Sequence, residues 1–232
     1  MGKGGGSSKT PHEAPDDLKS SQMLTVVDAI CEGPIEGPVD GLKSVRINKT
    51  PVLDSDGNAM VHGVTVVYRV GEDEQTAMEG FEDSGAETLL SVEVKKSEPV
   101  TRTITTKTLD RLRFTFGVQS LVSTSTKGDR NPTSVQMLIQ FRRDGQWQVE
   151  RDITITGKTT TQFLASVVID DLPPRPFEVR MLRLTDDSTT DLLQNRTVWS
   201  GYTEIIDVKQ CYPNTAVIGV KVDAEQFGNK KE

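Results

Sequence analysis

The sequence lacks long apolar runs and is poor in aromatic residues. No stretch of 18 apolar residues occurs, and residues 1–21 lack the apolar segment of a signal peptide. We therefore expect no membrane insertion and a protein made in a cytoplasm. Only 34% of the 232 residues are hydrophobic and 5% are aromatic, so the core must be spread over many Val, Ile and Leu side chains in thin, two-layer packing.

Cysteine and histidine are nearly absent, with two residues of each. A reducing compartment gives no reason for a disulfide framework. We expect Cys31 and Cys211 to be small buried residues, with a disulfide between them as the alternative. His12 and His62 have no His or Cys neighbour at the short spacing that metal ligands show.

A pattern like the start of a calcium loop begins at Asp54, where Asp56, Gly57 and Asn58 follow. A complete loop needs glutamate at its twelfth position, and Thr65 stands there. The sequence therefore predicts no metal and no cofactor.

No set of residues for catalysis can be nominated from the sequence. The carboxylate pairs Asp170-Asp171 and Asp186-Asp187 fall in expected loops, where solvated turns explain them. No Ser-His-Asp combination stands out either. We expect a protein that is not an enzyme.

Acidic residues outnumber basic ones by 34 to 27, which gives a formal net charge of −7. Binding to nucleic-acid phosphates requires a clustered cationic surface. The basic pairs Arg142-Arg143 and Lys95-Lys96 each have acidic residues close by in the sequence. We therefore expect no direct nucleic-acid binding.

What the sequence contains is a long series of β-strand patterns separated by turns. Leu112, Phe114 and Phe116, for example, alternate with polar residues. Seven strands of similar length between residues 90 and 184 indicate a β-sandwich within an all-β, mainly antiparallel fold. Strands are expected at residues 22–31, 41–48, 64–70, 90–95, 100–105, 111–116, 135–143, 147–156, 162–169 and 177–184.

The strongest hairpin signal is Asp144-Gly145, because both residues tolerate the positive φ that a tight turn requires. The strand after it changes phase near Arg151-Asp152, which predicts a β-bulge. Trp147, at the hairpin end, is expected to pack across the strands, with a ligand platform as the alternative.

Three other segments are expected to be irregular. Residues 1–21 offer too little apolar surface to order alone, so this arm is flexible or docks on a partner. Residues 71–87 are acidic and hold Phe81 as their only aromatic residue, so an exposed loop that touches a neighbouring subunit or faces solvent is expected. Residues 32–42 contain three glycines and two prolines, which force fixed turns.

Five stretches of the sequence carry a resemblance to a known family. They are residues 28–48, residues 112–117 (Leu-Arg-Phe-Thr-Phe-Gly), residues 129–132 (Asp-Arg-Asn-Pro), residues 172–177 (Leu-Pro-Pro-Arg-Pro-Phe) and residues 203–216. Together they closely resemble the N-terminal region of tail tip attachment protein J, the host specificity protein of lambda-like siphophages. The resemblance runs nearly from end to end.

This resemblance implies a structural protein of the phage tail tip in the virion. The family forms a central tail hub, usually a homotrimer, which closes the distal end of the tail and contacts other tail-tip proteins. Full-length members support host attachment and DNA delivery, and their receptor-binding part lies at the far C-terminus. The chain stops at Glu232, so we expect a prophage remnant, a split-gene product or an excised segment, assembled in the bacterial cytoplasm and without host receptor contacts of its own.

The resemblance and the strand patterns together predict three parts. These are a flexible arm at residues 1–21, a split tail-hub β domain at residues 22–90 and 197–228, and an inserted β-sandwich at residues 91–196. The last strand pattern has no partner downstream, which predicts exposed strand edges at residues 205–208 and 217–222. The expected interface residues are Ile205, Val208, Val217, Val220 and Val222.

Two other classes of function stay open at this point. A receptor- or carbohydrate-binding sandwich would need a groove lined by exposed aromatic side chains, for which Trp147, Trp199, Tyr202 and Tyr212 are available. An enzyme, such as a tail-associated wall hydrolase, would need two carboxylates that face each other across a cleft.

Overall fold

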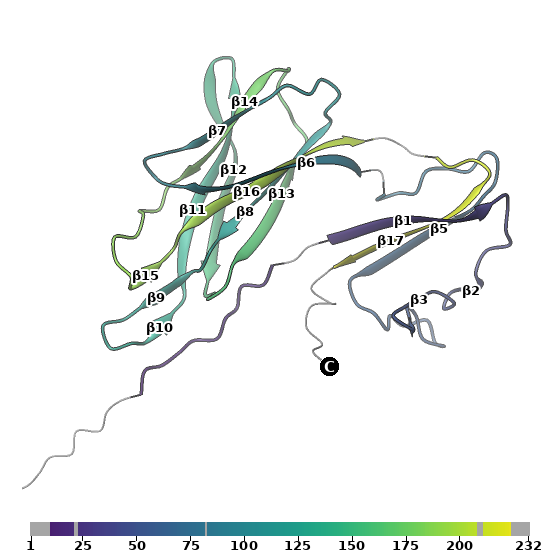
Figure 1. Cartoon of the computed structure of the whole chain (residues 1–232), viewed down its shortest axis with the longest axis horizontal. Coiled ribbons are helices and arrows are strands. Elements are labelled where there is room, and N and C mark those ends of the chain that lie inside the picture. The colour runs from purple at the N-terminus through teal and green to yellow at the C-terminus, as the bar shows by residue number, and fades with distance from the viewer. Residues whose placement is uncertain (1–9, 21–22, 82, 208–210, 224–232) are drawn as a thin grey trace, which may run out of the picture. The chain divides into compact units, whose positions relative to one another are not determined.

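The structure is a computed structural model that describes residues 10–20, 23–81, 83–207 and 211–223 (Figure 1). The predicted all-β, mainly antiparallel class is confirmed, because the elements are strands in antiparallel ladders. The chain divides into two compact units. The sandwich unit contains the described residues of 1–20 and 86–205, and the split unit contains those of 21–85 and 206–232.

The sandwich unit is built from two four-stranded sheets. One has the order β12-β11-β14-β7 and the other the order β13-β8-β16-β6, with a small sheet β10-β9-β15 at one end (Figure 1). The strands are β6 (Asp83–Val94), β7 (Val100–Ile104), β8 (Arg111–Val118), β9 (Val122–Thr124), β10 (Arg130–Asn131), β11 (Thr133–Arg143), β12 (Gln146–Gly157), β13 (Phe163–Ile169), β14 (Phe177–Arg183), β15 (Leu193–Gln194) and β16 (Thr197–Asp207).

An aromatic cluster connects the two sheets of the sandwich unit. The ring of Phe114 on β8 lies 6.0 Å from that of Phe141 on β11 and 5.8 Å from that of Trp199 on β16. All three side chains are buried, as the alternation along β8 and β11 predicts for the two phenylalanines. Inward residues of each strand thus supply the core, and their neighbours face outward.

The hairpin between β11 and β12 has the geometry that its sequence predicts. Asp144 and Gly145 have φ angles of 50° and 80°, which their residue types allow. The ladder shifts register where Ile139 pairs with Arg151 and Gln140 with Val149. A β-bulge therefore lies within a residue or two of the predicted position.

The split unit is organised around a three-stranded sheet of order β1-β17-β5. The strand β17 pairs with both neighbours, so the expected exposed edge at residues 217–222 is wrong. The split-domain prediction brings the two ends of the chain into one β unit, and both edges of β17 are used in that pairing. The strands are β1 (Met23–Glu32), β2 (Val39–Leu42), β3 (Arg46–Ile47), β4 (Thr50–Pro51), β5 (Val64–Val70) and β17 (Thr215–Asp223).

One face of this sheet is covered by the segment that follows β5. Met78 and Phe81 are buried and pack on Val217 of the central strand. A Cβ at position 219 would lie 2.8 Å from Cε1 of Phe81, so glycine lets the ring approach the sheet. The expectation that Phe81 belongs to an exposed loop is therefore wrong, because its ring forms the small core of the split unit.

The glycine-rich stretch after β1 lies beside the segment that leads into β17. The amide of Gly33 donates to the carbonyl of Asn214 at 2.6 Å, and the amide of Ile35 donates to the carbonyl of Val70 at 2.8 Å. Two stretches from opposite ends of the sequence thus form one end of the same sheet.

The compact units begin and end at positions that differ from the predicted domain limits. The strands β6 and β16 are neighbours inside the sandwich, although the prediction gave residues 197 onward to the split domain. Residues 10–20 also group with the sandwich unit. The difference arises because the inward side chains of β16, such as Trp199, complete the sandwich core.

Both strands should be needed for the sandwich to fold. A fragment of residues 95–196 lacks β6 and β16, which lie side by side in one sheet, whereas a fragment of residues 83–207 keeps them. We expect only the longer fragment to show a cooperative thermal transition in near-UV circular dichroism, since the shorter one loses Trp199 from the core. Equal cooperativity of the two fragments would contradict this assignment of β16.

Candidate functional site

The expected interface residues fall in different environments. Ile205 on β16 and Val217 on β17 are fully or almost fully buried within this chain, and Val222 is buried as well. Val220 is half-buried, and Val208 lies outside the described residues. The strand β16 runs between β8 and β6, so the expected exposed edge that starts at Ile205 is also wrong.

A candidate assembly surface lies on the other face of the β1-β17-β5 sheet. Cross-strand pairing aligns Leu24, Val222 and Val64 in one row, and the next row has the same apolar composition. Side chains alternate between the two faces of a sheet, so both rows lie opposite the face that Phe81 covers. We call this surface the open face; its residues are Leu24, Val26, Val64, Val66, Val220 and Val222.

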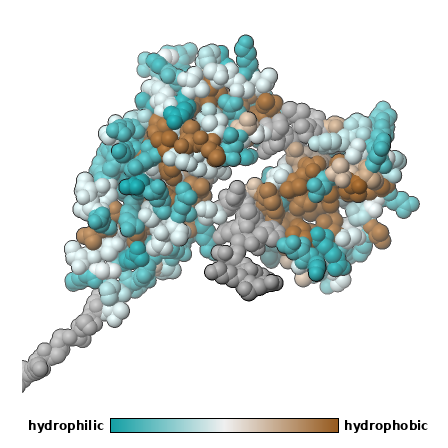
Figure 2. Space-filling model, viewed as in Figure 1, coloured by the Kyte–Doolittle hydropathy of each residue, from teal (hydrophilic) through white to brown (hydrophobic). Residues whose placement is uncertain are grey.

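The open face leaves apolar surface in contact with water at its β1 side. Leu24 is 53% exposed and Val26 is 40% exposed, while Val64, Val66 and Val220 are half-buried. Figure 2 shows hydrophobic residues gathered over the sheet of β1, β5 and β17. Contiguous apolar surface of this kind marks sites of protein association.

The outer edge of β1 adds a second feature to this surface. The strand is ten residues long and stands at one end of the sheet order, and within the described part of the chain its ladder joins only β17. An edge strand of this length presents unpaired backbone N–H and C=O groups to another chain. The open face and this edge therefore belong to one continuous candidate surface.

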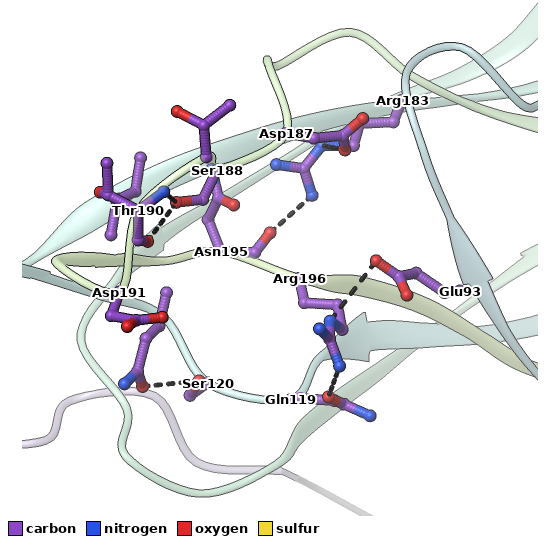
Figure 3. A pocket seen from close by; sticks show the side chains of 13 residues that line it. Glu93, Gln119, Ser120, Arg183, Asp187, Ser188, Thr190, Asp191, Asn195 and Arg196 are labelled. Carbon is purple, nitrogen blue, oxygen red and sulfur yellow. Dashed lines mark hydrogen bonds and ion pairs between the residues drawn. The ribbon is translucent and has the colours of Figure 1, made fainter.

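The sandwich unit contains a polar pocket of about 500 Å³ near β15 and the loop before it (Figure 3). Its lining residues are Glu93, Gln119, Ser120, Arg183, Asp187, Ser188, Thr189, Thr190, Asp191, Leu193, Gln194, Asn195 and Arg196. None of these residues is aromatic. The pocket therefore does not form the aromatic groove that the carbohydrate-binding alternative requires.

Arg183 fixes the loop that forms this pocket. Its side chain is 1% exposed, and its Nε lies 3.1 Å from Oδ1 of Asp187. The guanidinium donates hydrogen bonds to the carbonyl of Asn195 at 2.5 Å and to Oγ1 of Thr197 at 3.0 Å. It also donates hydrogen bonds to the carbonyls of Thr185 and Asp186. Burial lowers the pKa of the guanidinium, and the nearby carboxylates oppose this effect. Arg183 thus acts as an internal anchor.

Two further charged groups of the pocket, Arg196 and Glu93, pair with each other. Nε of Arg196 lies 3.4 Å from Oε1 of Glu93, and Nη1 donates to Oε1 of Gln119 at 3.4 Å (Figure 3). Two of the three carboxylates are therefore ion-paired with arginines. The arrangement holds a loop and offers a hydrated polar surface.

The four aromatic residues considered for a binding groove lie in different environments. Trp199 and Tyr202 belong to the buried core cluster of the sandwich unit. Trp147 is half-buried, with Arg180 4.3 Å and Arg142 5.9 Å from its ring centroid, so the ring is covered by guanidinium groups as a packing residue would be. Tyr212 lies in the split unit.

The residues considered for metals and disulfides have ordinary environments. No group of three or more His, Cys, Asp or Glu side chains that could hold a metal was found in the described ranges. The carboxylate of Asp54 accepts hydrogen bonds from the backbone amides of Asp56 and Asn58, and these bonds close a turn. Cys31 and Cys211 are both free and exposed, so the expectations of burial and of a disulfide are both wrong.

A family model for the FNIII-A domain of tip attachment protein J matches residues 84–208, which covers β6 to β16. The chain belongs to the tip attachment protein J family. Relatives named tip attachment protein J from Escherichia phages SECphi27 and SECphi4 are 32% and 30% identical to it over 97% of its length. The chain spans about a fifth of the length of these curated relatives.

Comparison with solved structures adds little to this assignment. The CBM22-1 xylan-binding domain of Paenibacillus barcinonensis Xyn10C covers 83% of the chain, and the chain covers 99% of that domain. Its TM-score of 0.29 and identity of 10% are too low to carry an argument. Among the described residues, no helix has the length and apolarity needed to cross a membrane.

Sequence reasoning missed Arg183 and Lys158, which are buried cations among the described residues of the sandwich unit. A signal for Arg183 was present, because it continues the inward phase of Phe177, Val179 and Met181 along β14. Lys158 follows β12 directly and has no such pattern.

Substitution of Arg183 should destabilise the sandwich unit. We expect Arg183→Met to lower the free energy of unfolding by about 3 kcal/mol, because buried carbonyls and Asp187 lose their partner. Arg196→Met is the matched control on an exposed side chain and should change it by about 0.5 kcal/mol or less. Guanidinium unfolding curves of the two variants measure the difference, and similar losses would contradict an anchoring role.

Proposed function

We propose that the chain is a structural part of a phage tail tip, the N-terminal hub portion of a tip attachment protein. In this proposal it builds the distal end of the tail as part of a homotrimer and contacts other tail-tip proteins. The full-length protein then supports host attachment and DNA delivery from the virion. The chain itself performs no catalysis in this role.

The observation that carries the proposal is the open face of the split unit. Leu24 and Val26 of its two aligned aliphatic rows are exposed, whereas Met78 and Phe81 cover the opposite face of the sheet. Covering apolar surface is favourable by roughly 25 cal/mol per Å². Leu24 and Val26 on β1 offer the most exposed part of it.

The position of β1 explains why a protein partner suits this surface. A partner that pairs with the outer edge of β1 would satisfy its backbone groups and extend the apolar face. The acidic balance of the chain disfavours a nucleic-acid partner for the same surface. Family membership supports partners among tail components, since the matched relatives carry the name tip attachment protein J.

A charge placed on the open face should weaken assembly. We expect native mass spectra of the purified chain to show trimers or complexes with tail-tip proteins. Val26→Asp should shift the assembly midpoint by about tenfold or more in concentration, because the carboxylate would be desolvated in the interface. Analytical ultracentrifugation over a concentration series measures this shift.

The matched control is Val149→Asp on β12, since Val149 is an exposed valine of the sandwich unit outside the open face. It should leave assembly unchanged. A chain that remains monomeric with and without tail-tip proteins, or one that Val149→Asp disturbs as much as Val26→Asp, would overturn the proposal.

A further inference from the structure

Residues 10–20 lie as an extended arm along the sandwich unit (Figure 1). Glu13 forms a parallel bridge with Arg130 of β10. The amide of Ala14 donates to the carbonyl of Arg130 at 3.0 Å, and the amide of Arg130 donates to the carbonyl of His12 at 2.8 Å. The first half of the arm is therefore fixed through its backbone, as an added strand would be.

Lys158 is the centre of the surface beneath the arm. Its side chain is 2% exposed, and Nζ lies 2.6 Å from Oδ1 of Asp16 and 3.3 Å from Oε1 of Glu13. A buried ammonium group is costly without a partner of opposite charge. Both carboxylates that pair with it come from the arm, so the arm completes the environment of Lys158.

The surface beneath the arm also forms hydrogen bonds with further side chains of the arm. The second oxygen of Asp16 accepts from the amide and the hydroxyl of Thr160 at 3.0 and 2.7 Å. The amide of Lys158 donates to Oδ1 of Asp17 at 2.6 Å, and the amide of Leu164 donates to Oγ of Ser20 at 2.8 Å. These contacts depend on three different side chains of the arm, Asp16, Asp17 and Ser20, so a slip of one residue would break most of them.

Shape complements these polar contacts. Leu18 packs against the core cluster of the sandwich unit. A Cβ at position 157 would lie 2.5 Å from Oδ1 of Asp17 and 2.8 Å from Cγ of Leu18, so glycine at this position leaves room for the arm. Backbone pairing, paired charges and an apolar anchor together make a recognition surface.

We propose that the surface formed by β10, Gly157 and residues 158–164 is a peptide-binding site that recognises an extended acidic segment, and that residues 10–20 of this chain are its ligand. The recognised features are carboxylates at positions 13, 16 and 17, an apolar side chain at 18 and a hydroxyl at 20. The site is separable from the arm, so it binds the same segment when it is supplied as a free peptide.

Peptide recognition itself does not depend on the proposed tail-tip role, so the two can be tested apart.

The test uses the chain without residues 1–20 and a synthetic peptide of residues 10–20. Isothermal titration calorimetry should show one peptide bound per chain. Asp16→Asn in the peptide and Lys158→Met in the chain should each weaken binding about tenfold or more, since each removes a charge-assisted hydrogen bond. A peptide with Thr10→Ala is the matched control and should bind as the unmodified peptide does.

A second measurement in the full chain covers the case in which the truncated chain does not fold. Trypsin should cut after Lys19 about tenfold faster in the Glu13→Gln, Asp16→Asn double variant than in the unmodified chain, because an undocked arm is open to the protease. A folded truncated chain that does not bind the peptide, or equal cleavage rates in the full chains, would overturn the proposal.

Arm docking should also have a defined pH range. Hydrogen bonds from Lys158 and Thr160 lower the pKa of Asp16 from 3.8 to about 2, and the bond to Asp16 raises the pKa of Lys158 above 10.5. The other charged groups that face this pair are Glu13, Asp17 and Arg130.

Because docking lowers the pKa of Asp16, its contribution is present above about pH 4 and is lost as the pH falls toward 2. The contribution of Lys158 is present below about pH 10.5 and is lost as the pH rises further. Peptide affinity should therefore be constant between about pH 5 and 9 and fall outside these limits. A clear change of affinity between pH 5 and 9 would contradict the assignment of Asp16 and Lys158 as the pair that controls docking.

Discussion

The pairing of β17 with both β1 and β5 is the constraint on which the rest of the structure depends. The two N-terminal strands share no ladder in the described sheet, so β17 joins them across nearly the whole length of the chain. All strands of the sandwich lie between β5 and β17 in the sequence. A long-range ladder of this kind gives the split unit its sheet, and the same ladder aligns the aliphatic rows of the open face.

The two units cover the apolar surface of their sheets in different ways. The sandwich closes one sheet on the other, and Phe114, Phe141 and Trp199 fill the space between them. The split unit has a single three-stranded sheet and the small β3-β4 sheet, and Phe81 covers one face of the three-stranded sheet. The open face is a consequence of this unequal coverage, which suits a domain that completes its packing in an assembly.

Two buried cations show how irregular segments are held on the sandwich. Arg183 binds the loop before β15, and Lys158 binds the N-terminal arm. In both cases a buried positive charge is paired with carboxylates and carbonyls of a segment that has little apolar surface of its own. Electrostatic pairing thus orders parts of the chain that the hydrophobic core does not reach.

The sequence by itself determined many of the strands, because alternation at Leu112, Phe114 and Phe116 and the Asp144-Gly145 turn are local patterns with local causes. It also contained the family resemblance. The tertiary structure alone decided that Val217 is interior, that β16 completes the sandwich, and that Glu13 and Asp16 meet Lys158. Those outcomes depend on which distant strands pair and on which face of a sheet is covered. A local stretch of sequence does not determine either of these.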